Sequence, residues 1–329
     1  MTGSGNFSGS NVLITGGMGF IGSNLARELV GRGAHVTLVD SLVPEYGGNL
    51  FNVADIEGNI RVNISDVRDE YSFRHLIQGQ DFLFNLAGQT SHLDSMENPY
   101  TDLEINCRAQ MSILEACRRY RPNIKIVFAS TRQIYGKPDY LPVDEKHLLR
   151  PVDVNGINKM TGEWYHILYN NVYDIRSCAL RLTNTYGPRM RIKDARQTFL
   201  GIWIRLLAEG RPFDVWEGHQ LRDFTFVSDV VDAMLLAAVS DDANGQVFNL
   251  GGEPAISLKD LADLLVKVNA GGSYVLRSFP GDRKRIDIGD YYANFEKIRT
   301  TLEWEPRVSL EQGLHRTVEF YRLHLAHYL

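Results

Sequence analysis

The 329-residue sequence predicts an α/β fold, in which helices cover both faces of a parallel sheet and a smaller C-terminal lobe follows. Two observations predict it. Short apolar runs alternate with segments of helical spacing from residue 11 to residue 182. The apolar runs contain few polar positions, which is typical of parallel strands, because helices above and below bury both of their faces.

The first three elements form one βαβ unit. Residues 11–15 are a short β-type run, residues 20–30 have helical spacing, and residues 35–40 are a second β-type run. Strand, helix and strand within about 30 residues predict two parallel strands joined by a right-handed crossover. The alternation continues with strands at 60–64, 82–86, 124–129 and 175–182 and helices near 70–77, 99–120 and 155–171.

Beyond Pro188 the alternation weakens. The segments expected there are helices around 196–209, 229–239, 257–268 and 309–325, a strand at 223–227 and a run at 247–250 that closes the first sheet. The site is expected in the cleft between two domains. The predicted division is a flexible Gly/Ser-rich tail at 1–10, a sheet domain from 11–187 plus 224–252, and a smaller substrate-binding lobe from 188–223 plus 253–329.

Composition argues against several classes of protein. Lys and Arg number 35 and Asp and Glu 40, a net charge of −5, so nucleic acid and anionic membranes are not expected partners. No apolar run reaches the roughly 18 residues that a membrane span needs. Cys107, Cys117 and Cys178 are far apart and flanked by apolar residues, which predicts reduced thiols in a cytoplasmic protein. The scattered histidines predict no metal site.

A glycine-rich turn joins the first strand to the first helix. Gly16, Gly19 and Gly22 have GxxGxxG spacing, which allows a tight turn and a close approach of the backbone to a pyrophosphate at the helix N-terminus. Asp40 ends the second strand, near the spacing at which a carboxylate accepts from a ribose 2′-hydroxyl. Because that carboxylate would repel a 2′-phosphate, we expect NAD rather than NADP, bound to a Rossmann-type sheet domain.

Further motifs follow in order along the chain. They are Asp66 in Ser-Asp-Val-Arg-Asp, Asn85-Leu-Ala-Gly88, Ser130-Thr131 followed by Ile134-Tyr-Gly136, Lys159, the run from Leu180 to Arg189 and the run from Arg222 to Asp229. Together with the glycine-rich turn, these motifs resemble the extended short-chain dehydrogenase/reductase family, in particular its nucleotide-sugar epimerases and dehydratases. The resemblance covers about residue 11 to about residue 320.

The resemblance implies roles for residues around the cofactor. Asp66 and Val67 would lie against the adenine, Ala87 and Gly88 beside the inner phosphate and ribose, and Lys159 on the nicotinamide ribose. The expected cofactor-binding residues are therefore Gly16, Gly19, Phe20, Ile21, Gly22, Asp40, Asp66, Val67, Ala87, Gly88 and Lys159.

The substrate that the resemblance implies is a nucleoside-diphosphate sugar. Asn184 would meet its sugar-phosphate portion and Arg222 its diphosphate, since a planar guanidinium binds phosphate oxygens in bidentate fashion. The amides of Gln89 and Gln133 are suited to sugar hydroxyls. Relatives dimerise through the helices near 99–120 and 155–171, so a homodimer is expected, with contacts from Met111, Leu114, Trp164 and Ile167.

The catalytic pattern of the family is broken at one position. Family members carry a Tyr four residues before the Lys, and its phenolate takes a proton from a sugar hydroxyl. Here that position is Asn155, whose amide does not titrate, although helical spacing still places it on one face with Lys159. Thr131 keeps the family's hydroxyl. Arg132 and Gln133 stand where the 4,6-dehydratases resemble Asp-Glu, so the ordinary 4,6-dehydratase reaction is not expected.

Three explanations are open for the missing phenol. Lys159 acts as base through a water, or Asp153, His92 or Tyr140 supplies the base, or redox chemistry has been lost. We predict an NAD-dependent nucleotide-sugar epimerase, or an atypical dehydratase, that works through a keto-sugar, with Thr131, Asn155 and Lys159 at the catalytic positions. The alternative is a non-catalytic protein of the same fold that binds NAD and a nucleotide sugar.

Overall fold

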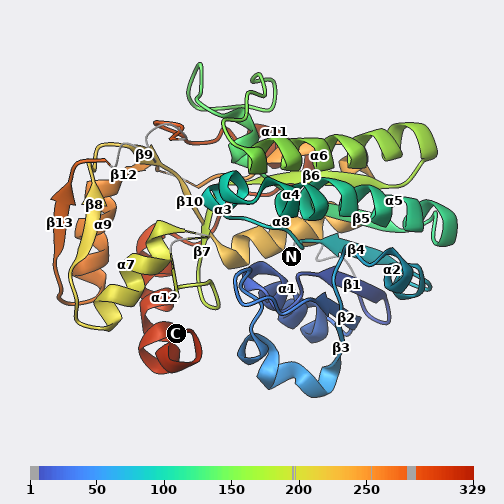
Figure 1. The fold of residues 1–329 in the computed structure, drawn as a ribbon, viewed down its shortest axis with the longest axis horizontal. Coiled ribbons are helices and arrows are strands. Elements are labelled where there is room, and N and C mark those ends of the chain that lie inside the picture. The colour runs from blue at the N-terminus through green and yellow to red at the C-terminus, as the bar shows by residue number, and fades with distance from the viewer. Residues whose placement is uncertain (1–6, 195, 197, 253, 280–286) are drawn as a thin grey trace.

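The computed structural model describes residues 7–194, 196, 198–252, 254–279 and 287–329. Its centre is a seven-stranded sheet in the order β11-β6-β5-β4-β1-β2-β3, with every neighbouring pair parallel (Figure 1). Its strands are β1 (Asn11–Thr15), β2 (His35–Asp40), β3 (Ile60–Ile64), β4 (Phe82–Asn85), β5 (Lys125–Thr131), β6 (Ser177–Leu182) and β11 (Val247–Asn249).

Helices cover both faces of this sheet, so the predicted doubly wound class is confirmed. One face carries α1 (Phe20–Gly31) and α8 (Val227–Val239), and the other carries α2 (Glu70–Leu76), α5 (Ala109–Tyr120) and α6 (Val154–Tyr173).

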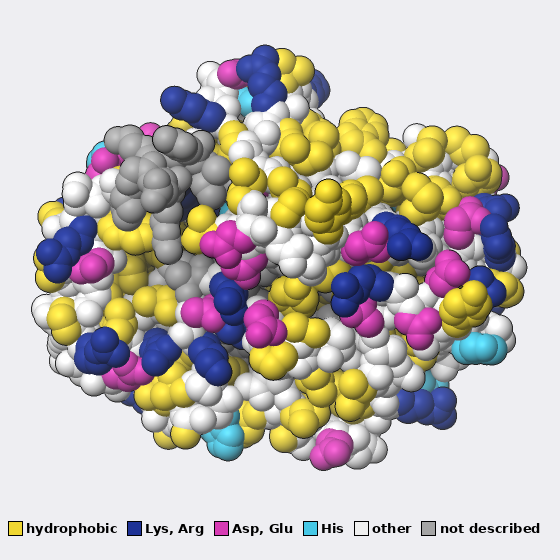
Figure 2. Space-filling view, viewed as in Figure 1, with side chains coloured by type: hydrophobic (Ala, Val, Ile, Leu, Met, Phe, Trp, Pro, Cys, Tyr) yellow, Lys and Arg dark blue, Asp and Glu magenta, His cyan; other side chains and the backbone are white. Residues whose placement is uncertain are grey.

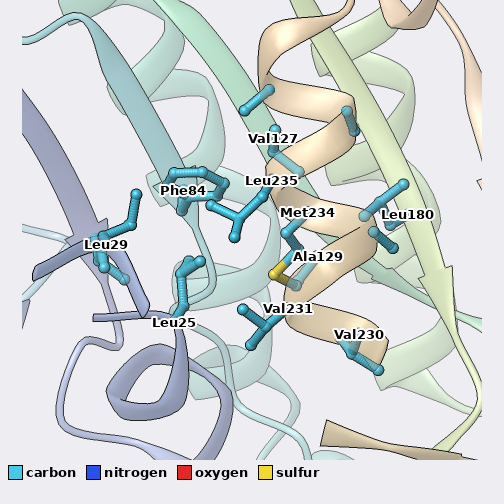
Figure 3. Packing of buried hydrophobic residues seen from close by; sticks show 14 of the residues in the cluster. Leu25, Leu29, Phe84, Val127, Ala129, Leu180, Val230, Val231, Met234 and Leu235 are labelled. Carbon is cyan, nitrogen blue, oxygen red and sulfur yellow. The ribbon is translucent and has the colours of Figure 1, made fainter. Parts of the chain in front are cut away.

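Successive side chains of each strand supply the two cores in turn, because they point to opposite faces of the sheet. Val12 and Ile14 pack with α1 and α8, whereas Leu13, which lies between them in β1, packs with α2 and α5. Figure 3 shows the first core, where Leu25 of α1 and Met234 of α8 lie on the same face of the sheet. Each fully buried Leu or Met contributes about 1.5–3 kcal/mol relative to exposure.

The expected helix at 99–120 is divided into three parts. It comprises α4 (Pro99–Leu103), a π-helical turn (Glu104–Arg108) and α5. Several elements were not predicted from the sequence, among them a 3-10 helix at Leu50–Asn59, α3 (His92–Glu97) and a 3-10 helix at Arg132–Tyr135. The last two border the site.

The smaller lobe is built mainly from helices around short strand pairs. Trp203, Leu261 and Leu314 lie in its core. Its helices are α7 (Phe199–Ala208), α9 (Leu258–Val268) and α12 (Leu310–His324), and its strand pairs are β7 (Asn184–Tyr186) with β10 (Phe224–Phe226), β8 (Phe213–Trp216) with β13 (Tyr274–Arg277), and β9 (Leu221–Arg222) with β12 (Ile256–Ser257). Among the described residues, no helix is both long and apolar enough to cross a membrane.

Three features differ from the predicted domain division. Strands β7 and β10, assigned to the sheet domain, pair with each other outside the seven-stranded sheet and pack in the core of the smaller lobe. Phe7 is fully buried, with its ring 5.1 Å from that of Phe82, so residues 7–10 belong to the fold and not to a flexible tail; residues 1–6 lie outside the described part. Helix α11 (Glu296–Leu302), from a segment assigned to the smaller lobe, packs through Ile298 and Leu302 into the core beneath the sheet. The remaining boundaries stay a prediction.

Candidate functional site

The glycine-rich turn lies at the carboxyl end of β1 and opens onto a cavity. Gly16 has a φ of +66°, and a Cβ on Gly22 would clash with the carbonyl oxygen of Gly16. Gly19 is the N-cap of α1 and supplies no side chain to it, so the first backbone N–H groups of the helix are free for a ligand. Phe20 and Ile21 line the same cavity. This cradle fits a pyrophosphate.

Asp40 lies at the adjacent strand end and also lines the cavity. Its two carboxylate oxygens accept hydrogen bonds from the backbone N–H groups of Met18, at 3.0 Å, and Leu42, at 2.9 Å. Burial raises the pKa of Asp40, while these two hydrogen bonds lower it in part. A carboxylate has lone pairs beyond the two used here, so Asp40 is still able to accept from a ribose hydroxyl.

The predicted contacts for the adenine and for the rest of the cofactor lie along the same cavity. Asp66 is held by a fork of Arg68, with Nη2 at 2.6 Å and Nε at 2.9 Å from its carboxylate oxygens. Val67, Ala87 and Gly88 continue the wall. A Cβ on Gly88 would lie 3.1 Å from Nζ of Lys159, so glycine keeps the ammonium accessible.

Lys159 projects from α6 toward the end of β5. Its Nζ donates to the carbonyl oxygen of Ala129 at 2.9 Å and lies 4.9 Å from the ring centre of Phe128. Burial lowers the pKa of Lys159 to about 8, and the nearby carboxylate of Asp102 counteracts part of this shift. At neutral pH the ammonium form therefore still predominates, which makes Lys159 a cation and a donor in this cavity.

Asn155 lines the cavity one turn before Lys159, but its amide nitrogen is committed elsewhere. Nδ2 lies 2.9 Å from Oδ2 of Asp102, 2.8 Å from the backbone oxygen of Gln89 and 3.2 Å from its side-chain oxygen. Asn158 donates to the other oxygen of Asp102 at 2.8 Å. The two amides thus satisfy a fully buried carboxylate, and Asn155 ties α6 to the loop that carries Gln89.

A histidine and a carboxylate meet at the edge of this cavity. Nδ1 of His92 lies 2.9 Å from Oδ2 of Asp153, and the side chain of His92 is 37% exposed where it lines the cavity. Asp153 is also the N-cap of α6, since its Oδ1 accepts from the backbone N–H of Gly156 at 2.7 Å. Burial raises the pKa of Asp153, but the contact with His92, together with hydrogen bonds from Gly156 and Gln133, outweighs this and leaves the pKa lowered.

The other bases considered from the sequence are placed less favourably. Tyr140 is 47% exposed, lies outside the cavity lining and donates to Asp144 at 2.7 Å. Tyr140 is therefore not placed to act as a base on a ligand in this cavity, whereas the side chains of His92 and Asp153 contact each other. Sequence analysis named both residues, but nothing in the local sequence indicated that they form a pair.

The predicted substrate residues divide into two groups. Thr131, Gln133 and Asn184 line the cavity. The structure differs from the prediction for Gln89 and Arg222, which do not line it: Gln89 is buried and donates to the backbone oxygen of Ser91, and Arg222 donates to the backbone oxygens of Leu221 and Gly289. Arg132, not assigned a binding role from the sequence, does line the cavity.

The fold, the glycine cradle and the buried Lys159 define a Rossmann-type enzyme with a dinucleotide site at the carboxyl ends of its strands. The model of the NAD dependent epimerase/dehydratase family matches residues 12–251, and the chain belongs to this family.

Relatives cover nearly the whole chain. A putative UDP-glucose 4-epimerase of Methanocaldococcus jannaschii is 32% identical over 313 residues, 94% of this chain and 97% of the relative. The structure of the UDP-glucose 4-epimerase of Thermotoga maritima with UDP-glucose is 29% identical, with a TM-score of 0.86 and coverage of 96% and 99%. The UDP-glucuronic acid 4-epimerase of Bacillus cereus, in complex with UDP-glucuronic acid and NAD, is 25% identical, with a TM-score of 0.84 and coverage of 95% and 99%.

These findings confirm the predicted family, NAD as the cofactor, and an enzyme of the nucleotide-sugar epimerase and dehydratase class. The roles of the individual site residues stay predictions.

Proposed function

We propose that this chain is an NAD-dependent epimerase, or an atypical dehydratase, of a nucleoside-diphosphate sugar, in which His92 oriented by Asp153 replaces the usual phenol as acid and base. The observation that carries the proposal is that the His92–Asp153 pair borders the same cavity as Lys159 and the glycine cradle. A keto-sugar forms when one sugar carbon loses hydride and its hydroxyl loses a proton.

The residues present fit NAD. The N-terminus of α1, with Gly16, Gly19 and Gly22, would hold the pyrophosphate, Asp40 a ribose diol and Lys159 the nicotinamide ribose. NAD, when bound, supplies the acceptor for the hydride. The chain's own side chains must then orient the sugar and move the hydroxyl proton.

His92 is suited to move that proton. The contact between Nδ1 of His92 and the carboxylate of Asp153, at 2.9 Å, is an ion-pair contact and not an aligned hydrogen bond. The negative charge beside Nδ1 favours the tautomer that carries its proton there, which leaves Nε2 as the acceptor, and it stabilises the imidazolium that results. Asp153 is itself fixed by the backbone of Gly156 and by Nε2 of Gln133 at 3.1 Å. Lys159, which is mainly protonated at neutral pH, would stabilise negative charge on the sugar oxygen, and Thr131 would share a hydrogen bond with it.

A second function is favoured by one observation. Asn155 occupies the position of the family's Tyr and its nitrogen is used to satisfy Asp102, which would also be expected of a chain that binds NAD and a nucleotide sugar without turnover. Absorbance near 340 nm distinguishes the two functions. Purified protein mixed with a panel of UDP-, dTDP-, CDP- and GDP-sugars should show a transient signal of reduced nicotinamide for an enzyme. Binding of a sugar nucleotide without any such signal would support the non-catalytic function.

We further propose a homodimer that forms through α5 and α6. Apolar side chains gather over α6 in the upper right of Figure 2, and Trp164 and Ile157 of that helix are 55% and 47% exposed. Met111 of the neighbouring helix α5 is also exposed, but Leu114 and Ile167, predicted as contacts, are buried within one chain. Trp164→Glu should shift the mass measured by light scattering to that of a monomer, whereas Leu323→Glu, at an exposed position of α12, should not.

A cytoplasmic location is the last part of this proposal. It rests on three cysteines that are all free, two of them buried, as expected for a chain that folds in a reducing compartment.

A further inference from the structure

Arg132 lies beside Thr131 at the start of a 3-10 helix and lines the cavity. Its Nη2 donates to Oδ1 of Asn184 at 3.1 Å, and its guanidinium carbon lies 5.2 Å from the ring centre of Tyr291. These contacts fix the plane of the guanidinium. Its Nη1 is buried and has no hydrogen-bond partner among the described residues.

Among the residues that the structure describes, no carboxylate forms an ion pair with Arg132. The nearby Asp223 is occupied, since its oxygens bind the hydroxyl of Thr183 and the backbone N–H of Ala293. Asp287 lies 3.4 Å from Arg222 instead. Burial lowers the pKa of Arg132, with Tyr291 and Asp223 counteracting part of the shift. A buried cation that lacks an anionic partner is costly, so an anion that enters the cavity is bound strongly there.

Arg222, which was expected from the sequence to bind the diphosphate, has a guanidinium that the protein's own groups already bind. Its Nη1 donates to the backbone oxygens of Leu221 and Gly289, and its Nη2 contacts Asp287. Burial lowers the pKa of Arg222 to about 10, and the positive charge of Arg132 adds to this effect, so the two guanidinium groups are near each other. Of the two, Arg132 is the one with a free donor at the cavity.

We infer that Arg132 is the specificity-determining residue of this cavity and binds an anionic oxygen group of the substrate, beside Thr131 and Asn184. This inference rests on the proposed function. Two parts of a nucleotide sugar offer that chemistry: a carboxylate on the sugar ring and the phosphate next to the sugar. A planar guanidinium binds either by charge-assisted hydrogen bonds, which a lysine reproduces only in part.

The test uses calorimetric titration of the NAD-loaded protein. UDP, dTDP, CDP and GDP identify the nucleotide first, and the titration then compares its glucose and glucuronate derivatives in the wild type, Arg132→Gln and Arg132→Lys. If Arg132 binds a sugar carboxylate, Arg132→Gln lowers the affinity for the glucuronate derivative about 30-fold or more and the affinity for the glucose derivative less than threefold. If Arg132 binds the phosphate, the affinities for the nucleoside diphosphate and for both derivatives fall by a similar factor. Arg132→Lys should recover part of the affinity in either case.

Controls keep the result interpretable. Arg277→Gln removes an exposed arginine of β13 that pairs with Asp214, and should leave every affinity unchanged. NAD affinity and melting temperature of the Arg132 variants show whether the fold is intact. Affinities within threefold of wild type for all ligands in Arg132→Gln overturn the inference and leave the proposed function standing. A wild-type protein that binds no nucleotide or nucleotide sugar overturns both.

Discussion

Nδ1 of His92 and Oδ2 of Asp153 lie 2.9 Å apart, where α3 begins and where α6 is capped. The carboxylate is buried and the imidazole is partly exposed to the cavity. This arrangement resembles the base and orienting carboxylate of known proton-transfer sites, in which the second nitrogen of the ring is free to take a proton.

Removal of the imidazole should affect turnover more than binding. His92→Gln keeps a polar side chain of similar reach but cannot take up a proton near neutral pH. We expect the rate of reduced-nicotinamide formation to fall by about 10²–10⁴-fold, the usual contribution of a general base, while the dissociation constant of NAD stays within about threefold. Stopped-flow absorbance at 340 nm measures the first quantity and fluorescence titration the second. A variant with wild-type rate would assign the base to another group.

Asp153 caps α6 and also carries the negative charge beside His92, and the substitution Asp153→Asn separates these two roles. In Asp153→Asn the amide oxygen still caps α6, because Asn is as good an N-cap as Asp, but the charge beside His92 is lost. Turnover should fall about tenfold or more with little change in melting temperature. In Asp153→Ala both are lost, and the free energy of unfolding should fall by a further ~1 kcal/mol. Equal stability of the two variants would show that the cap contributes nothing.

Asn155 should act on stability through Asp102. Asn155→Ala removes one of the two side-chain amides that satisfy this buried carboxylate, so the free energy of unfolding should fall by about 1–3 kcal/mol. Urea unfolding measures it, with Asn171→Ala, at an exposed position of α6, as control. Because an amide does not titrate, the pH dependence of turnover should keep its shape. A changed pH profile would mean that Asn155 takes part in the proton transfer.

Lys159 should make stability depend on pH. Its pKa is about 8 in the folded protein and 10.5 ordinarily, so between these values the unfolded state binds more protons and unfolding becomes harder as pH rises. The cost of the buried ammonium is fully present below pH 8 and is on the order of 3 kcal/mol. In cofactor-free protein, Lys159→Met should therefore be more stable relative to wild type at pH 7 than at pH 10.5. Lys146→Met, at an exposed position, should show no such difference; a flat result for Lys159→Met as well would contradict the lowered pKa.

The sheet could be predicted because its signals are local. The apolar runs of β1, β2 and β5 and the glycines between β1 and α1 each carry their own pattern. The burial of Phe7 could not be predicted in the same way, because the residues around it are Gly, Asn and Ser and its partner Phe82 lies far along the chain.

The site was predicted less completely, because the direction of a side chain depends on tertiary contacts. Residues whose position follows from the backbone, such as Gly22, Asp40 and Lys159, line the expected cavity. Arg222 does not, since carbonyl oxygens from β9 and from Gly289 bind its guanidinium. No sequence motif indicates that Nη1 of Arg132 lacks a hydrogen-bond partner, because this depends on the folded chain.

A crystal structure of the complex with NAD and a nucleotide sugar tests the central claim most directly. We expect Nε2 of His92 within about 3 Å of a hydroxyl oxygen on the sugar carbon that faces the nicotinamide, with Lys159 on the nicotinamide ribose. A sugar whose hydroxyl meets a different titratable side chain, with His92 turned away, would contradict it.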